Sequence, residues 1–60
     1  MGTEETVEFF SRLMKRYSQS HNGQRPTVED MKEMTSQEGY NFSVKEVKDY
    51  GRKALEKMIR

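Results

Sequence analysis

Apolar residues recur every three or four positions in the first third of the chain, at Val7, Phe10, Met14 and Tyr17. This spacing is typical of an amphipathic helix that buries one face. Thr3 is placed to cap the helix, because a threonine hydroxyl accepts a hydrogen bond from the free backbone N–H groups of the first turn. The pair Asn22-Gly23 is placed to end it, since both residues tolerate a left-handed conformation. The pattern predicts a helix over residues 4–21.

A second, shorter helix is predicted over residues 28–38. Thr27 and Asp30 have the spacing of a capping box, in which each side chain bonds the backbone N–H of the other residue. Pro26 lies just before the cap, where its missing N–H costs nothing. Gly39 is expected to stop the helix. The inward positions are Val28, Met31 and Met34.

The third predicted helix covers residues 44–58 and has the best-specified start in the sequence. Ser43 and Glu46 form a full capping box, and Phe42 and Val47 form the matching hydrophobic staple. The chain is therefore expected to be all-α: a small three-helix bundle, long–short–long and helix-turn-helix-like, within a single domain of residues 1–60. The predicted buried positions of the third helix are Val44, Val47, Gly51, Ala54, Leu55 and Met58.

Gly51 is unusual, because a glycine inside a helix costs about 1 kcal/mol relative to alanine. One interpretation is close packing against a bulky side chain of the first helix, Phe10 or Met14. The other is a hinge or a notch that a partner contacts. The sequence leaves both interpretations open.

Composition argues against catalysis and against a metal site. The 60 residues contain no cysteine and a single histidine, His21, so a disulfide framework, a thiolate zinc site and a histidine-based triad all lack their residues. A core this thin does not enclose a substrate pocket. We therefore expect no enzymatic activity, no cofactor and no small-molecule substrate. No apolar run approaches the roughly 20 residues of a membrane span, and a cytoplasmic location is expected.

Charge is nearly balanced overall, with a formal net charge of +1, but it is unevenly placed. Residues 26–42 carry four carboxylates against one lysine, and residues 43–60 carry six cations against three carboxylates. At 100° per residue, three of these cations share one stripe of the third helix. Such a stripe could lie along a phosphate backbone, but charge patterns of this kind are more often those of a solvated helix surface. The stripe consists of Lys45, Lys48 and Arg52.

Two stretches of the sequence resemble known families. Residues 23–31, Gly-Gln-Arg-Pro-Thr-Val-Glu-Asp-Met, resemble the first motif helix of helix-turn-helix DNA-binding units of the SOS-repressor and sigma-factor middle-region type, and residues 43–47 resemble the start of their recognition helix. Residues 39–47, Gly-Tyr-Asn-Phe-Ser-Val-Lys-Glu-Val, are similar to a segment of the leader-peptide family associated with nitrogen fixation. The first resemblance implies DNA binding, and the second implies recognition by another protein.

The sequence therefore favours a small regulatory protein that binds DNA through its third helix, using Lys45, Lys48 and Arg52. The alternative is a protein–protein interaction module without nucleic-acid contact, such as an adaptor, an inhibitor or a leader-like domain. A monomer–dimer equilibrium is also expected, since so small a core leaves reason to share apolar surface. The residues expected to contact a protein partner are Phe9, Tyr50, Gly51 and Ile59.

Overall fold

The computed structural model contains three helices, α1 (Thr3–Ser20), α2 (Val28–Gln37) and α3 (Val44–Ile59). It describes residues 2–59, the side chain of Ile59 excepted, and this part of the chain contains no strand. The predicted all-α, three-helix architecture is confirmed. Every predicted helix boundary lies within one residue of the observed one.

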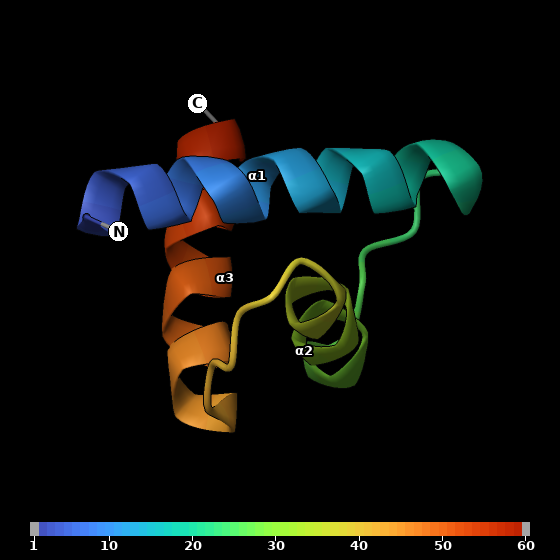
Figure 1. Cartoon of the computed structure of the whole chain (residues 1–60). Helices are drawn as coiled ribbons and strands as arrows, with labels where there is room; N and C mark the ends of the chain where they lie inside the picture. The colour runs from blue at the N-terminus through green and yellow to red at the C-terminus, as the bar shows by residue number, and fades with distance from the viewer. Residues whose placement is uncertain (1, 60) are drawn as a thin grey trace.

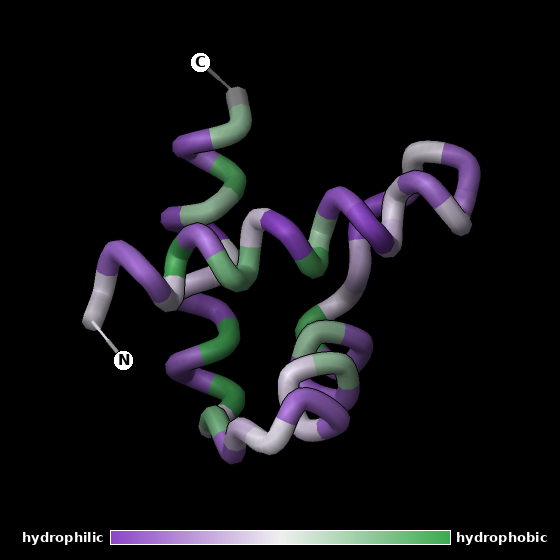
Figure 2. The backbone as a smooth tube through the Cα atoms, turned by 45° about the horizontal axis from the view of Figure 1, so that its top comes forward, coloured by the Kyte–Doolittle hydropathy of each residue, from purple (hydrophilic) through white to green (hydrophobic). Residues whose placement is uncertain are grey.

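Helix α3 is the central element, because its packing against α1 and against α2 is more extensive than the packing of α1 against α2. Figure 1 shows α3 running behind α1 and crossing it, with α2 beside α3 and seen nearly along its own axis. In Figure 2 the hydrophobic segments of α3 lie on the side that faces α2, and its hydrophilic segments lie on the opposite side. The amphipathic period of the sequence thus fixes which face of α3 turns inward.

An aromatic cluster occupies the centre of the core. Phe10 is fully buried, and its ring lies 5.4 Å from that of Phe42 and 5.6 Å from that of Tyr50, centroid to centroid. Edge-to-face and tilted pairs at these separations are the favoured geometries of aromatic rings. The Phe10 ring thus packs α1 both against the connector between α2 and α3, residues 38–43, and against α3 itself. The buried apolar residues are Val7, Phe9, Phe10, Leu13, Met14, Met31, Val47 and Ala54.

The start of α2 follows the sequence prediction. The Asp30 backbone N–H donates to the Thr27 hydroxyl at 3.1 Å, and the Thr27 N–H donates to the Asp30 carboxylate, also at 3.1 Å. This is the predicted capping box, and it satisfies two N–H groups that the first turn leaves without helical partners.

The start of α1 differs from the prediction that Thr3 caps the helix. Gly2 is the N-cap residue, in an extended conformation and without a side-chain hydrogen bond. Thr3 is already helical, whereas a capping side chain requires a non-helical backbone. The hydroxyl of Thr6 donates to the Gly2 carbonyl at 2.8 Å, which ties the first turn together from inside the helix.

Left-handed residues end the first two helices, as the sequence predicted. Asn22 and Gly23, with φ of 56° and 81°, follow α1. Gly39, with φ of 92°, follows α2, and the next N–H, that of Tyr40, donates to the Thr35 carbonyl at 3.0 Å. This is the hydrogen bond of a Schellman motif. It turns the chain sharply toward α3.

Two residues predicted to be buried on α3 are exposed. Val44 is 45% exposed and Met58 is 38% exposed. Val44 is the first residue of the helix, and the C-terminal end of α3 projects past α1 (Figure 1). The period of the sequence identifies the inward face of a helix but not how far along that face its neighbours reach.

Candidate functional site

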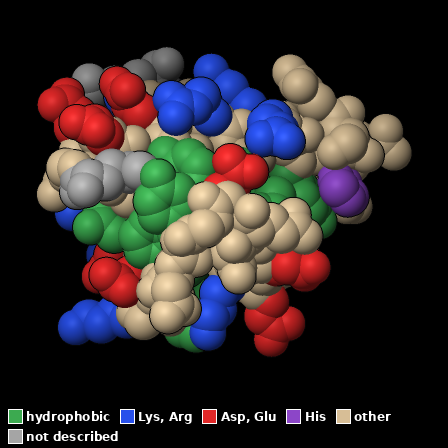
Figure 3. All heavy atoms as spheres, in the orientation of Figure 1, with side chains coloured by type: hydrophobic (Ala, Val, Ile, Leu, Met, Phe, Trp, Pro, Cys, Tyr) green, Lys and Arg blue, Asp and Glu red, His purple; other side chains and the backbone are tan. Residues whose placement is uncertain are grey.

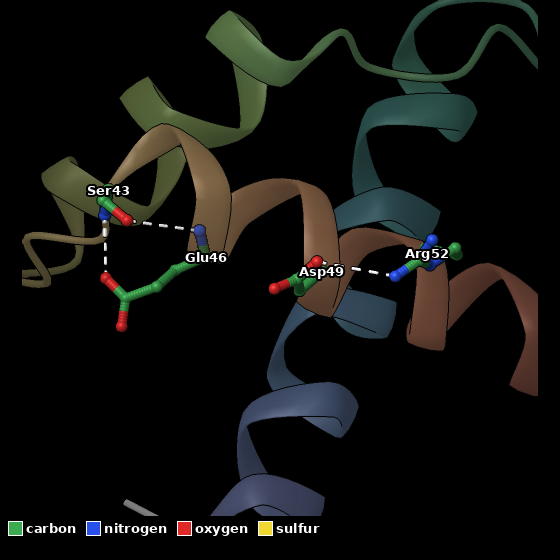
Figure 4. A network of polar contacts seen from close by, with 4 residues as sticks. All are labelled: Ser43, Glu46, Asp49 and Arg52. Carbon is green, nitrogen blue, oxygen red and sulfur yellow. Dashed lines mark hydrogen bonds and ion pairs between the residues drawn. The ribbon is translucent and has the colours of Figure 1, made fainter.

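Helix α3 begins with the hydrogen bonds that the sequence predicted. The Ser43 N–H donates to Glu46 Oε1 at 2.9 Å, and the Glu46 N–H donates to Ser43 Oγ at 3.2 Å (Figure 4). Phe42 is half-buried against the core, and Val47 is 2% exposed. The capping box fixes the first turn, and the two apolar residues fix how α3 lies on the bundle. Together they determine which α3 side chains face outward.

The three candidate cations, Lys45, Lys48 and Arg52, are all exposed. Arg52 Nη2 lies 3.5 Å from Asp49 Oδ1, one turn earlier on the same helix (Figure 4). Ion pairs at this level of exposure contribute little to stability, so the pair leaves Arg52 able to contact a partner. Among the described residues, neither Lys45 nor Lys48 has an ion-pair partner. The predicted stripe therefore exists as a surface feature.

The remaining cations described on α3 each lie near another side chain of the domain. The Lys57 ammonium lies 3.4 Å from Glu8 Oε1 on α1, and the Lys53 ammonium lies 5.8 Å from the centre of the Tyr50 ring. The second distance is within the range of a cation–π contact. All of these cations are exposed, but Lys53 and Lys57 each have a contact with a side chain of the domain, whereas Lys45 and Lys48 have no ion-pair partner among the described residues.

An apolar groove of about 230 Å³ runs between the start of α2 and the middle of α3. We call it the α2–α3 groove. Pro26, Val28 and Leu55 are half-buried and supply its accessible apolar surface, while Lys48 and Arg52 are its exposed charged lining residues. The other lining residues are Met14, Thr27, Met31, Val47 and Gly51.

Gly51 lies in this groove and not against α1. A Cβ atom built on Gly51 meets no heavy atom within 4 Å, so the predicted close packing against Phe10 or Met14 is wrong. The reason is the position of Gly51 on the helix: Val47 and Ala54 face the core, and Gly51 lies to one side of them. The missing side chain leaves space that belongs to the groove.

The other residues predicted to contact a protein partner have different positions. Phe9 is 8% exposed and lies 5.0 Å from the ring of Tyr40, so its prediction as an exposed contact is wrong. Tyr50 is half-buried against Phe10 and offers only part of its ring. Ile59 lies outside the residues whose side chains the structure describes. Of the four, Gly51 is the one that the structure places in an open groove.

A polar cluster that the sequence did not reveal joins the end of α1 to the start of α2. The Tyr17 hydroxyl donates to Asp30 Oδ2 at 3.2 Å, and the His21 ring stacks on Tyr17 at 3.8 Å. Hydrogen bonds from the Thr27 backbone and side chain, and then from Tyr17, lower the pKa of Asp30. Desolvation, followed by the bond to Asp30, raises the pKa of Tyr17. The cluster links α1 to the start of α2, which is a structural role.

Charges of both signs surround the apolar surface elsewhere on the molecule. On the face shown in Figure 3, Lys and Arg side chains and Asp and Glu side chains both border the hydrophobic patch. Two larger hollows, of about 480 and 530 Å³, are likewise lined by carboxylates and ammonium groups together. The α2–α3 groove differs from both, because its charged lining residues are all cationic.

No protein-family model, curated protein or solved structure matches this chain. Within the described residues, no helix has the length and apolar character needed to cross a membrane. The same residues contain no group of three or more His, Cys, Asp or Glu side chains placed to hold a metal ion.

The sequence identified the α3 residues Lys48, Gly51 and Arg52 of the groove, but not its α2 side. It selected Lys48 and Arg52 for their charge, and Gly51 as a notch for a partner. It assigned Val28 and Leu55 to the core, although both are half-buried and line the groove. The signal was present in the sequence: Gly51, Leu55 and Lys48 lie side by side on the helical wheel. The missing information was that α2 lies beside them.

Proposed function

We propose that this chain is a small, non-enzymatic interaction domain that binds another protein through the α2–α3 groove. The observation that supports it is an apolar groove, open to solvent, whose charged lining residues are all cations. Apolar surface beside polar residues is typical of sites where proteins dock. Helical bundles commonly take partner segments in the grooves between their helices.

The size of the groove favours a protein segment over a small molecule. Pockets that enclose drug-sized ligands have volumes of about 300–1,000 Å³ and bury most of the ligand. The α2–α3 groove has about 230 Å³ and is open to solvent. A side chain presented by another protein fits such a shallow groove, because the rest of the segment contacts the rim.

DNA binding through α3 is the second candidate function, and the exposure of Lys45, Lys48 and Arg52 favours it. A helix that enters a groove of DNA brings its whole outer face close to phosphates. The outer face of α3 also carries Asp49 and Glu56, both of which would oppose phosphate. We therefore place DNA binding second.

Site-specific photocrosslinking in cells that make the protein tests the proposal. A benzoylphenylalanine residue replaces Lys48 at the rim of the groove or, as the control, Arg12 on the exposed surface of α1. We expect a discrete protein adduct from position 48 and none from position 12. The adduct should disappear in Leu55→Gln, with circular dichroism confirming that this variant remains helical.

A salt titration against unrelated duplex DNA tests the second candidate. DNA binding predicts affinity that falls steeply with salt, with a slope reduced by about one unit for each phosphate contact removed from Lys45, Lys48 or Arg52. Protein binding predicts no such affinity. A nucleic-acid adduct at position 48, together with a steep salt slope, would replace the proposed function by DNA binding.

A further inference from the structure

Gly51 has no structural role that the fold of this chain requires. It is helical and lies outside the left-handed conformations that Gly23 and Gly39 adopt. No neighbouring atom approaches closely enough to exclude a Cβ. A helix interior disfavours glycine, so the residue carries a cost that nothing within the described domain offsets. The space it leaves open lies in the α2–α3 groove.

The electrostatics of the groove indicate the sign of its occupant. Its charged lining residues are Lys48 and Arg52, and no carboxylate among the described residues lines it. The side chain of Arg52 is 72% exposed, and its ion pair with Asp49 is itself open to water. Lys45 lies about two turns before Arg52 toward the start of α3 and is also exposed. A partner that covers the apolar lining places its own charged groups beside these cations.

We infer that the α2–α3 groove binds an acidic amphipathic segment of a partner protein, with one large apolar side chain seated over Gly51 and carboxylates facing Lys48 and Arg52. This inference rests on the proposed function and adds the chemistry of the partner. The apolar side chain fills the space that glycine leaves and contacts Val28 and Leu55. The carboxylates replace the solvent around the two cations, so binding weakens as the salt concentration rises.

Selection of a displayed library of random 12-residue peptides on the whole chain tests the inference. Enriched peptides should carry net negative charge and at least one large apolar residue. Their affinity should fall at least tenfold for Gly51→Leu, whose side chain occupies the space over Gly51. Gly51→Ala should cause a smaller loss. Both variants should retain the thermal midpoint of the parent chain or exceed it, which separates loss of binding from loss of fold.

Charge reversal tests the inference independently of Gly51. In the double variant Lys48→Glu and Arg52→Glu, both changes are at exposed positions, so the fold should persist. The enriched peptides should lose at least tenfold in affinity for this variant, and a fresh selection on it should yield basic peptides. The matched control is Arg12→Glu and Lys15→Glu on α1, which should leave peptide binding unchanged.

The outcomes separate this inference from the proposed function. Peptides without an acidic bias whose affinity still falls for Gly51→Leu would overturn the inference and leave protein binding through the groove in place. Peptides whose affinity ignores both Gly51→Leu and the charge reversal bind elsewhere on the domain and would overturn both. Failure to enrich any peptide would overturn both. Sedimentation that shows self-association abolished by Gly51→Leu would assign the groove to a second copy of the chain, and the acidic-partner inference would then be wrong.

Discussion

Replacing Gly51 with alanine is expected to stabilise this domain. The structure shows open space where the new methyl group would lie, so the substitution introduces no clash. Alanine gains about 0.8–1 kcal/mol over glycine inside a helix. With an unfolding entropy of about 2.1 cal/mol/K per residue, the 60 residues give about 0.13 kcal/mol/K. The thermal midpoint should therefore rise by about 6–8 °C.

Thermal unfolding, followed by the circular dichroism signal of the helices, measures this change in the midpoint. Gly39→Ala provides the matched control. Gly39 also meets no atom within 4 Å of a built Cβ, but its φ is +92°. A left-handed conformation costs an L-residue about 1–2 kcal/mol, so Gly39→Ala should lower the midpoint. A Gly51→Ala variant less stable than the parent would refute the reasoning, because it would require the close packing that the structure excludes.

Three further predictions concern the core and the caps. Phe10→Ala should cost about 3–5 kcal/mol, much of the roughly 3–9 kcal/mol expected for a domain of this size, and urea unfolding should show the chain largely unfolded or barely stable. Ser43→Ala should cost about 1 kcal/mol with an unchanged denaturant slope; no loss would contradict the α3 capping box. The lowered pKa of Asp30 means that its hydrogen bonds stabilise the fold above the unfolded pKa of about 3.9 and that this contribution is lost as pH falls through the lower, folded value. Asp30→Asn should therefore flatten the acid side of the stability profile, and a profile identical to the parent's would contradict the assignment.

The helix boundaries were predictable because their signals are local. The two capping boxes each lie within four residues, and the Gly39 turn depends on the neighbouring backbone. Such bonds form wherever the chain becomes helical, whatever the rest of the fold does. The failed cap at Thr3 belongs to the same class, but there the helix begins one residue earlier than expected.

Burial along each helix was less predictable, since it depends on how the helices cross. Phe9 was expected to contact a partner, but Tyr40, in the segment between α2 and α3, packs on the Phe9 ring. Val44 was expected to be buried, but it is 45% exposed at the first position of α3. Periodicity gives the direction of a side chain, whereas its burial depends on an element distant in sequence.

The candidate site was also predictable only in part. The charge of Lys48 and Arg52 and the anomaly of Gly51 were visible in the sequence. Their meeting with Val28 across a groove required the position of α2 beside α3. A groove between two helices is a property of their packing, and no single-helix pattern encodes it.

Methionine methyl groups report on the α2–α3 groove most directly. Met14 and Met31 line the groove, whereas Met58 is exposed at the far end of α3 and does not. The chain, labelled with ¹³C at its methionine methyl groups, is titrated with the peptide that selection enriches most strongly. Binding in the groove predicts saturable shifts of the Met14 and Met31 signals, with Met58 nearly unchanged. Saturable binding that leaves the Met14 and Met31 signals in place would contradict the groove as the binding site.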